Sequence, residues 1–315
     1  MTKIEWCDIT INPAVGCSKC YPGCDNCYAE KFAARLSKHP NQKIAAKYKG
    51  VVDEHGRWTG EFYEDFSCFE KLPKKPSWIF ICSMGDFFHE KFLRQSSLIA
   101  LVALILEHPE HTFFCLTKRP ERMKIAFDWV YRNLEIEIGI DLFHGQPIPN
   151  LWLGVTVCNQ AEADAKIPIL LSTPAAKRFV SIEPMLSNIN LSHRVLSDYS
   201  EKNFLSGELF IPGDCGTGSQ TIPGKKLDWV ICGGETGPGA RPMHPDWVIS
   251  LRDQCVDAGT PFFFKSWGEW TTEYTYTDAV STPGAYLSGA PFARIGKRRT
   301  GRLIDGREWN EVPPC

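Results

Sequence analysis

The sequence predicts an α/β protein that folds as a single (β/α) barrel, full or partial. Two observations support this fold class. Six apolar runs of strand length alternate with stretches of helix length over most of the 315 residues. The runs are apolar along their whole length, as expected of parallel strands that are buried on both faces. Alternation of this kind indicates parallel βαβ units, and a doubly wound sheet is the alternative arrangement.

The predicted strands share a short apolar core with β-branched or aromatic residues. They are residues 77–83, 111–117, 150–157, 177–184, 227–234 and 260–267. The predicted helices are residues 26–37, 91–107, 120–134, 160–171 and 245–258. Proline marks the first turn of two of these helices, at Pro120 and Pro245. Gly259 ends the last one, since glycine adopts the left-handed conformation that closes a helix.

Three segments interrupt the alternation. Residues 39–76 are polar and punctuated by glycine, which predicts an insertion after the first helix. Residues 187–226 are rich in Ser, Asn, Gly and Pro, which predicts an insertion that forms a surface loop. We expect the barrel domain, with its N-terminal cysteine loop, to span residues 1–267. Residues 268–315 then form a C-terminal extension packed on or near the barrel.

Composition limits the possible function classes. Hydrophobic residues make up 43% and charged residues 23%, and the formal net charge is −2, so the whole protein has no basic signature for nucleic acid. The N-terminus has no apolar signal-peptide core, and no run approaches the roughly 18 apolar residues of a membrane helix. With 13 cysteines in such a chain, we expect a reducing compartment, the cytoplasm, and no membrane partner.

Four cysteines lie close together near the N-terminus, at Cys17, Cys20, Cys24 and Cys27. Spacings this short strain disulfide bridges, so the thiolates are expected to converge on a metal centre. A four-iron cluster held by three cysteines would keep one iron open to a ligand. A zinc site is the alternative, although zinc ribbons usually separate their cysteine pairs by about a dozen or more residues. A ferredoxin-like electron carrier uses a similar compact run.

Polar side chains follow the predicted strands, where barrel enzymes build their active sites. Asp86 and Glu183 are carboxylates suited to an ammonium or hydroxyl group. Lys118 and its neighbour Arg119 could hold a carboxylate or a phosphate. A single polar residue after a buried strand is ordinary, because the chain is leaving the core there. Polar residues follow several strands, however, and this repetition favours a shared pocket.

A glycine-rich loop follows the strand at 227–234. Gly233 and Gly234 would let a ligand approach the backbone, and Glu235 could accept from ribose hydroxyls or an amino group. A plain glycine loop is the competing interpretation. His89 and His244 are acid/base candidates, although a single histidine is more often structural. No catalytic residue is assigned.

These residues carry a family resemblance. CYPGCDNC, followed by strand–helix alternation, resembles the radical S-adenosylmethionine (SAM) superfamily. The set SMGDFFH, LTKRPERM, NLWLGVTV, FVSIEPML, DWVICGGETGPGARPMHPDW and PFFFKSWGEW is similar to a phage-associated three-Cys-motif protein family, distantly reminiscent of spore photoproduct lyase. The likeness covers residues 1 to about 270 and the segment GRLIDGREWNE. The family pattern selects Cys17, Cys24 and Cys27, whereas the superfamily spacing selects Cys20 with the latter two.

The resemblance implies a radical-SAM-like barrel with a [4Fe-4S] cluster that cleaves SAM to a 5′-deoxyadenosyl radical. It implies that Asp86 falls in the segment that contacts the SAM amino group, and that Lys118 and Arg119 are candidates for the SAM carboxylate or a substrate phosphate. It also implies that Glu183 and Gly233–Gly234 lie near the ribose and adenine. Expected partners are an electron donor and a nucleic-acid or nucleotide substrate for modification or repair, with phosphate contacts from the basic stretch 294–302.

Two rival functions remain open from the sequence. One is a non-enzymatic binding module that carries zinc or an iron–sulfur cluster and acts with a partner protein. The other is a barrel enzyme of another kind, in which the cysteine loop only braces the fold.

Overall fold

A computed structural model describes residues 4–92, 94–138, 146–192, 194–195, 200–212, 219–271, 286–287 and 290–314. The chain divides into two compact units. The first comprises residues 1–155 with 172–177, and the second comprises residues 156–171 with 178–315.

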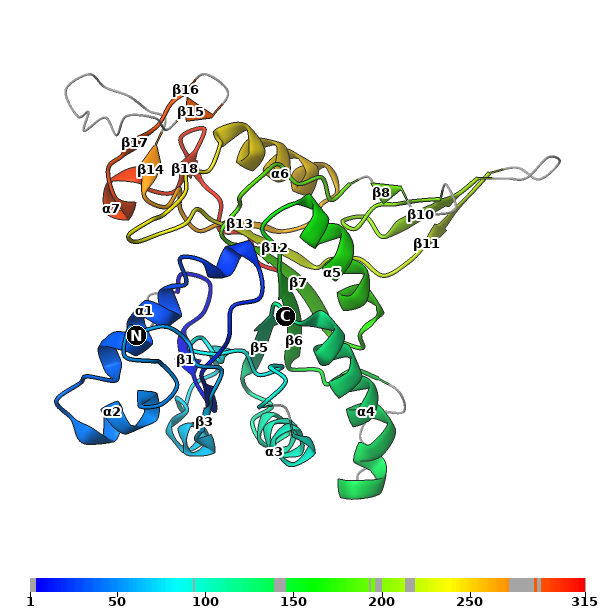
Figure 1. The fold of residues 1–315 in the computed structure, drawn as a ribbon. Coiled ribbons are helices and arrows are strands. Elements are labelled where there is room, and N and C mark those ends of the chain that lie inside the picture. Colours follow the sequence, from blue (N-terminus) through cyan, green and yellow to red (C-terminus); the bar gives the residue numbers. More distant parts are fainter. Residues whose placement is uncertain are drawn as a thin grey trace. The chain divides into compact units, whose positions relative to one another are not determined.

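Four parallel strands form the centre of the first unit, in the order β1-β4-β5-β6 (Figure 1). They are β1 (Ile9–Ile11), β4 (Trp78–Ile81), β5 (Thr112–Thr117) and β6 (Leu151–Thr156). In the register of this sheet Ile79 lies beside Phe113, and both side chains are fully buried. The apolar run of each strand is therefore explained by burial of its two faces.

Helices connect the parallel strands of the first unit, because a parallel pair needs a crossover connection. The helices and remaining short elements are η1 (Pro22–Cys24), α1 (Tyr28–Leu36), α2 (Gln42–Tyr48), η2 (Phe66–Lys71), α3 (Gln95–Leu106), α4 (Pro120–Ile138), β2 (Ala14–Val15) and β3 (Tyr63–Glu64). α3 joins β4 to β5, and α4 joins β5 to β6. The small β2-β3 pair is antiparallel.

The second unit repeats the strand–helix pattern with three parallel strands in the order β7-β12-β13. These are β7 (Lys177–Ile182), β12 (Trp229–Cys232) and β13 (Phe262–Phe264), with helices α5 (Gln160–Ser172) and α6 (Pro245–Asp257). The start of α6 follows its sequence signals: the His244 side chain accepts from the Asp246 backbone amide, and Pro245 follows it. Gly259, with φ of +62°, follows its C-terminus.

Small antiparallel sheets complete the second unit (Figure 1). They are built from β8 (Arg194–Val195), β9 (Glu201–Lys202), β10 (Glu208–Ile211), β11 (Gln220–Pro223), β14 (Trp270–Thr271), β15 (Tyr286–Leu287), β16 (Ala290–Pro291), β17 (Ala293–Arg294), β18 (Leu303–Ile304) and β19 (Arg307–Glu308), with the short helix α7 (Lys297–Thr300). β8 to β11 form one sheet, and β14 pairs with β17.

The α/β class is confirmed, and all six predicted strands and all five predicted helices are present. β1 and α2 are absent from the prediction, because a three-residue strand and a seven-residue helix give too little periodicity. The predicted surface loop at 187–226 contains strands β8 to β11, whose largely exposed β10 and β11 lack the apolar alternation of a half-buried strand. Residues 272–285 and 288–289 of the predicted extension lie outside the described residues. Among the helices that are described, none has the length and apolarity needed to cross a membrane.

Candidate functional site

A close crossing of two glycines fixes the start of the cysteine loop, residues 17–27. Gly16 forms a parallel bridge with Gly85, and its amide donates to the Met84 carbonyl over 3.1 Å. A Cβ on Gly85 would lie 2.7 Å from the Gly16 oxygen, so any side chain there would force the two segments apart. Gly16 has φ of +121°, and its Cβ would lie 2.2 Å from the Glu61 carbonyl oxygen. The next residue of each segment is Cys17 and Asp86, respectively.

Arg119 ties the cysteine loop to the carboxyl end of the strands. Its Nη1 lies 3.1 Å from Asp86 Oδ2 and 3.8 Å from Cys17 Sγ. Its Nη2 donates to the carbonyl and hydroxyl oxygens of Ser18, over 3.1 and 3.0 Å. Only 7% of the Arg119 side chain is exposed. The loop is therefore held at the edge where β1, β4 and β5 end.

Asp86 is buried, and its carboxylate accepts from four groups. The Phe88 amide and the Thr117 hydroxyl donate to Oδ1, over 3.0 and 2.8 Å. The Lys118 amide and the Arg119 guanidinium donate to Oδ2, over 3.2 and 3.1 Å. Since both oxygens are occupied, Asp86 acts in this structure by orienting Arg119 and the end of β5.

His89 supports the same loop. Its Nδ1 accepts from the Lys91 amide over 3.2 Å, and its Nε2 lies 2.7 Å from the Ser18 hydroxyl. Nδ1 is thus unprotonated, and Nε2 carries the proton. Burial lowers the pKa of His89, and the charge of Arg119 lowers it further. In this structure His89 contacts Ser18 of the cysteine loop, and His244 caps the start of α6.

The four thiols differ in environment. Cys24 is buried, Cys17 and Cys27 are half-buried, and Cys20 is exposed. Burial raises the pKa of Cys17 to about 12, and the Asp86 carboxylate adds to this. The Cys20 thiol donates a hydrogen bond to Cys24, which raises the pKa of Cys20 and lowers that of Cys24. No disulfide joins any of the eleven cysteines in the described part of the chain.

Zinc and iron–sulfur clusters require different separations between their cysteine sulfur atoms. Zinc with Zn–S bonds of about 2.3 Å holds its sulfur atoms about 3.8 Å apart. Among the described residues, a set of three ligand atoms that all lie within 4.8 Å of one another occurs at His108, Glu110 and His111, not in the cysteine loop. In a cubane cluster each cysteine binds a different iron, so its sulfurs are further apart than those around one zinc ion. The four thiols are donors of a type that both zinc and iron–sulfur clusters use.

Lys118 lies near the cysteine loop, and its charge contributes to the lowered pKa of Cys24. Its backbone is fixed by the bond to Asp86, and its side chain is half-buried. The structure thus brings together Asp86, Lys118 and the cysteines, all within the first unit.

The second unit holds the remaining predicted residues. Glu183 follows β7 and forms an ion pair with Lys265, which follows β13. Gly233 directly follows β12 and lies between them: a Cβ there would lie 3.2 Å from the Lys265 Cβ and 3.6 Å from the Glu183 carboxyl carbon. Parallel strands explain this grouping, since their carboxyl ends meet at one edge.

Gly234 and Glu235 have structural explanations. A Cβ on Gly234 would lie 2.1 Å from the Trp267 carbonyl oxygen, so glycine is needed where the chain's own backbone approaches. Glu235 is buried and accepts a bidentate ion pair from Arg241, over 2.9 Å to Nε and 2.6 Å to Nη2. In this structure both residues of the glycine-rich loop therefore contact other residues of the chain: Gly234 lies against Trp267, and Glu235 pairs with Arg241.

Three residues of these sites were missed by sequence reasoning: Ser18, Thr117 and Lys265. Serine, threonine and lysine are too common at strand ends to stand out. Thr117 is the last residue of β5, and Lys265 directly follows β13, so position relative to a strand end is the signal that could have found them.

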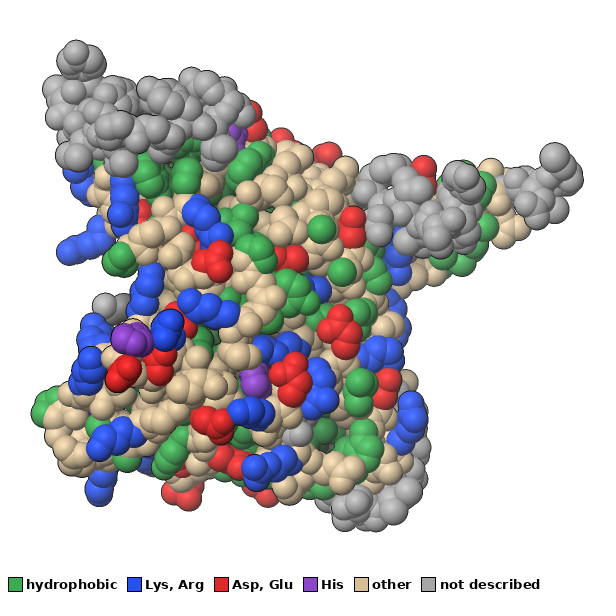
Figure 2. Space-filling model, in the orientation of Figure 1, with side chains coloured by type: hydrophobic (Ala, Val, Ile, Leu, Met, Phe, Trp, Pro, Cys, Tyr) green, Lys and Arg blue, Asp and Glu red, His purple; other side chains and the backbone are tan. Residues whose placement is uncertain are grey.

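The basic stretch 294–302 contains both partly buried and exposed residues. Arg294 donates to the Gly237 carbonyl, and Arg302 donates to the Phe264 carbonyl. Arg298 and Arg299 of α7 are exposed. Figure 2 shows basic side chains gathered over α7.

Comparison with known proteins gives one match. Residues 1–313 match a protein family described as a protein of unknown function (DUF5131), and the chain belongs to this family. No curated protein and no solved structure matches the chain.

Proposed function

We propose that this member of the DUF5131 family is a radical SAM enzyme with a radical-SAM-type (β/α) barrel and a [4Fe-4S] cluster held by the cysteine loop. The observation that carries the proposal is the position of the loop. Arg119 holds it beside Asp86 at the carboxyl end of β4 and β5, the edge at which barrel enzymes bind their substrates. A catalytic cluster must lie at this edge, whereas a metal that only braced the fold could lie anywhere, so the position supports the catalytic alternative.

The cluster ligands in this proposal are Cys17, Cys24 and Cys27. Cys24 and Cys27 belong to both possible spacings. Cys17 is the half-buried candidate for the third position and contacts Arg119, whereas Cys20 is exposed. Three ligands leave one iron open to the amino and carboxylate groups of SAM. When bound, the cluster would supply the electron that cleaves SAM to a 5′-deoxyadenosyl radical.

The protein's own residues would bind and orient SAM. Lys118 offers an ammonium group beside the loop for the SAM carboxylate. Asp86 acts through Arg119, because its oxygens already accept four hydrogen bonds. In the second unit, Glu183 lies beside Gly233, and Lys265 positions the Glu183 carboxylate.

Nucleic acid is the proposed substrate class. Arg298 and Arg299 are exposed on α7 and offer two positive charges to a phosphate backbone. The test is fluorescence anisotropy with single-stranded DNA and RNA at several salt concentrations. Arg298→Glu/Arg299→Glu should weaken binding and flatten its salt dependence. Arg94→Glu/Arg132→Glu makes the same charge change at exposed positions of the first unit and should have little effect.

The deciding experiment is anaerobic iron–sulfur reconstitution, followed by reduction with SAM and chromatography for 5′-deoxyadenosine. We expect deoxyadenosine from the wild type and none from Cys24→Ala. Cys7→Ala removes a half-buried cysteine outside the loop and is the matched control. Cys17→Ala should lose iron, whereas Cys20→Ala should keep it. An assembled cluster that leaves SAM intact would refute the radical chemistry and favour the binding module with a partner protein.

A further inference from the structure

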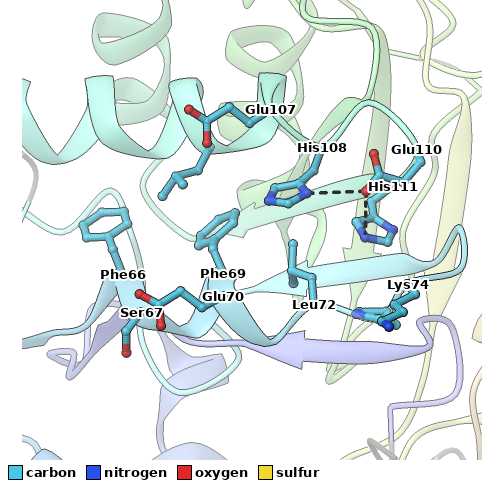
Figure 3. A pocket seen from close by; sticks show the side chains of 12 residues that line it. Phe66, Ser67, Phe69, Glu70, Leu72, Lys74, Glu107, His108, Glu110 and His111 are labelled. Carbon is cyan, nitrogen blue, oxygen red and sulfur yellow. Dashed lines mark hydrogen bonds and ion pairs between the residues drawn. The ribbon is translucent and has the colours of Figure 1, made fainter.

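A second group of metal-binding side chains lies in the first unit, away from the cysteine loop. His108, Glu110 and His111 follow the C-terminus of α3, and β5 begins directly after them. They line a cavity of about 610 Å³ together with residues of η2 and the segment that follows it (Figure 3). The cavity is at the amino end of β5, whereas Thr117 and the cysteine loop are at its carboxyl end.

The three side chains converge on one point. In Figure 3 the Glu110 carboxylate lies between the imidazole rings of His108 and His111. Glu110 Oε1 is 3.4 Å from His108 Nδ1 and 3.5 Å from His111 Nε2. One ligand atom from each residue lies within 4.8 Å of the other two.

These separations match the edges of a metal tetrahedron. An ion with bonds of about 2.1 Å to nitrogen and oxygen holds its ligand atoms about 3.4 Å apart. They are longer than a good hydrogen bond, which spans about 2.7 to 3.2 Å. The geometry thus suits an ion between the side chains better than direct hydrogen bonds between them.

His111 provides an independent observation. Its side chain is 1% exposed, and neither ring nitrogen has a hydrogen-bond partner within the described residues. A neutral imidazole carries one donor and one acceptor, and burying both unpaired is costly. Nε2 is the ring nitrogen that faces Glu110, and an ion bound to it would give this buried atom a partner. His108 and Glu110 are partly exposed, which gives the ion a path from solvent.

We infer that His108, Glu110 and His111 bind one divalent transition-metal ion, with zinc as the expected occupant. Two imidazoles and one carboxylate are a ligand set that zinc uses in proteins, with water in the fourth position. The ion would tie the end of α3 to the start of β5. The site lies at the amino end of β5, whereas Asp86 and Lys118 lie at its carboxyl end. The inference does not depend on the proposed function.

The test uses the full chain, stripped with a chelator and titrated with Co²⁺ as a spectroscopic substitute for zinc. Nitrogen and oxygen ligands give visible d–d bands without the thiolate-to-cobalt charge-transfer absorption that ligation by the cysteine loop would produce. We expect one such Co²⁺ per chain, displaced by Zn²⁺, and a higher melting temperature when metal is present.

Two variants at partly exposed positions identify the ligands without disturbing the core. Glu110→Gln and His108→Ala should each weaken Co²⁺ binding by at least about tenfold and remove the thermal shift. Glu107→Gln changes an exposed carboxylate that lines the same cavity and should bind as the wild type does. The inference is overturned if no Co²⁺ binds, if all bound Co²⁺ shows thiolate absorption, or if both ligand variants keep the affinity of the wild type.

Discussion

Replacement of Arg119 by methionine tests whether this side chain holds the cysteine loop in place. Methionine keeps the side chain's length and apolar packing but removes the guanidinium group. Four hydrogen bonds are lost: one to Asp86, two to Ser18 and one to the Cys17 sulfur. The Asp86 carboxylate, with 7% of its side chain exposed, then stays buried without its cationic partner.

The expected cost follows from this burial. Removing one partner of a buried ion pair destabilises proteins by about 3 to 5 kcal/mol. The lower end applies here, because Asp86 keeps its bonds from Phe88, Thr117 and Lys118. We expect the free energy of unfolding to fall by about 3 kcal/mol. Adding Asp86→Asn removes the unpaired charge and should recover about 1 kcal/mol or more of this loss.

The assay is urea denaturation followed by circular dichroism, with the free energy extrapolated linearly to water. Alkylation of Cys17 by iodoacetamide, followed by mass spectrometry, reports on the loop itself. It should be faster in Arg119→Met, because the contacts of Ser18 are gone. Arg57→Met is the matched control, since Arg57 pairs with Asp53 at an exposed position of the same unit.

Two results together would refute the reasoning. They are a stability of Arg119→Met indistinguishable from that of Arg57→Met, and an unchanged alkylation rate at Cys17. The loop would then be held by contacts other than those of Arg119.

Three further predictions concern other positions. Gly85→Ala should lower the stability by about 1 to 3 kcal/mol in urea denaturation, because its Cβ would lie 2.7 Å from the Gly16 oxygen; an unchanged midpoint would contradict the close crossing. Lys166→Met should cost about 3 kcal/mol or more, since it leaves the buried Glu162 carboxylate unpaired, and adding Glu162→Gln should restore part of it. His89 has a lowered pKa in the folded state, so its contribution to stability is present above its unfolded pKa near 6.5 and is lost as the pH falls. His89→Gln should therefore lose less stability than the wild type between about pH 7.5 and pH 5, and equal losses in the two proteins would contradict the assignment.

Much of the secondary structure could be predicted because the strands are buried on both faces. Continuous apolar runs such as residues 111–117 leave few alternatives to a central strand. The short strand β1 and the exposed strands β10 and β11 could not be found in this way. β1 has only three residues, and β10 and β11 are largely exposed, so none of them shows a clear hydrophobic periodicity.

The candidate site was predictable in part. The four cysteines are conspicuous in the sequence, and the residues after each strand follow from parallel topology. Local pairing could not be predicted: Glu235 is occupied by Arg241, and Gly234 is needed for the approach of Trp267. The group at His108, Glu110 and His111 also escaped prediction, because its signal is the convergence of atoms and the burial of one imidazole.

The sequence by itself determined the α/β class, the order of the strands and helices, and a loop with four cysteines close together along the chain. Tertiary structure decided what surrounds that loop. Arg119 and Cys17 are 102 residues apart and meet only because β1, β4 and β5 run parallel and end at one edge. A charged side chain at that edge binds a ligand or pairs with another residue according to the distances between them. Packing sets these distances, and spacing along the chain does not.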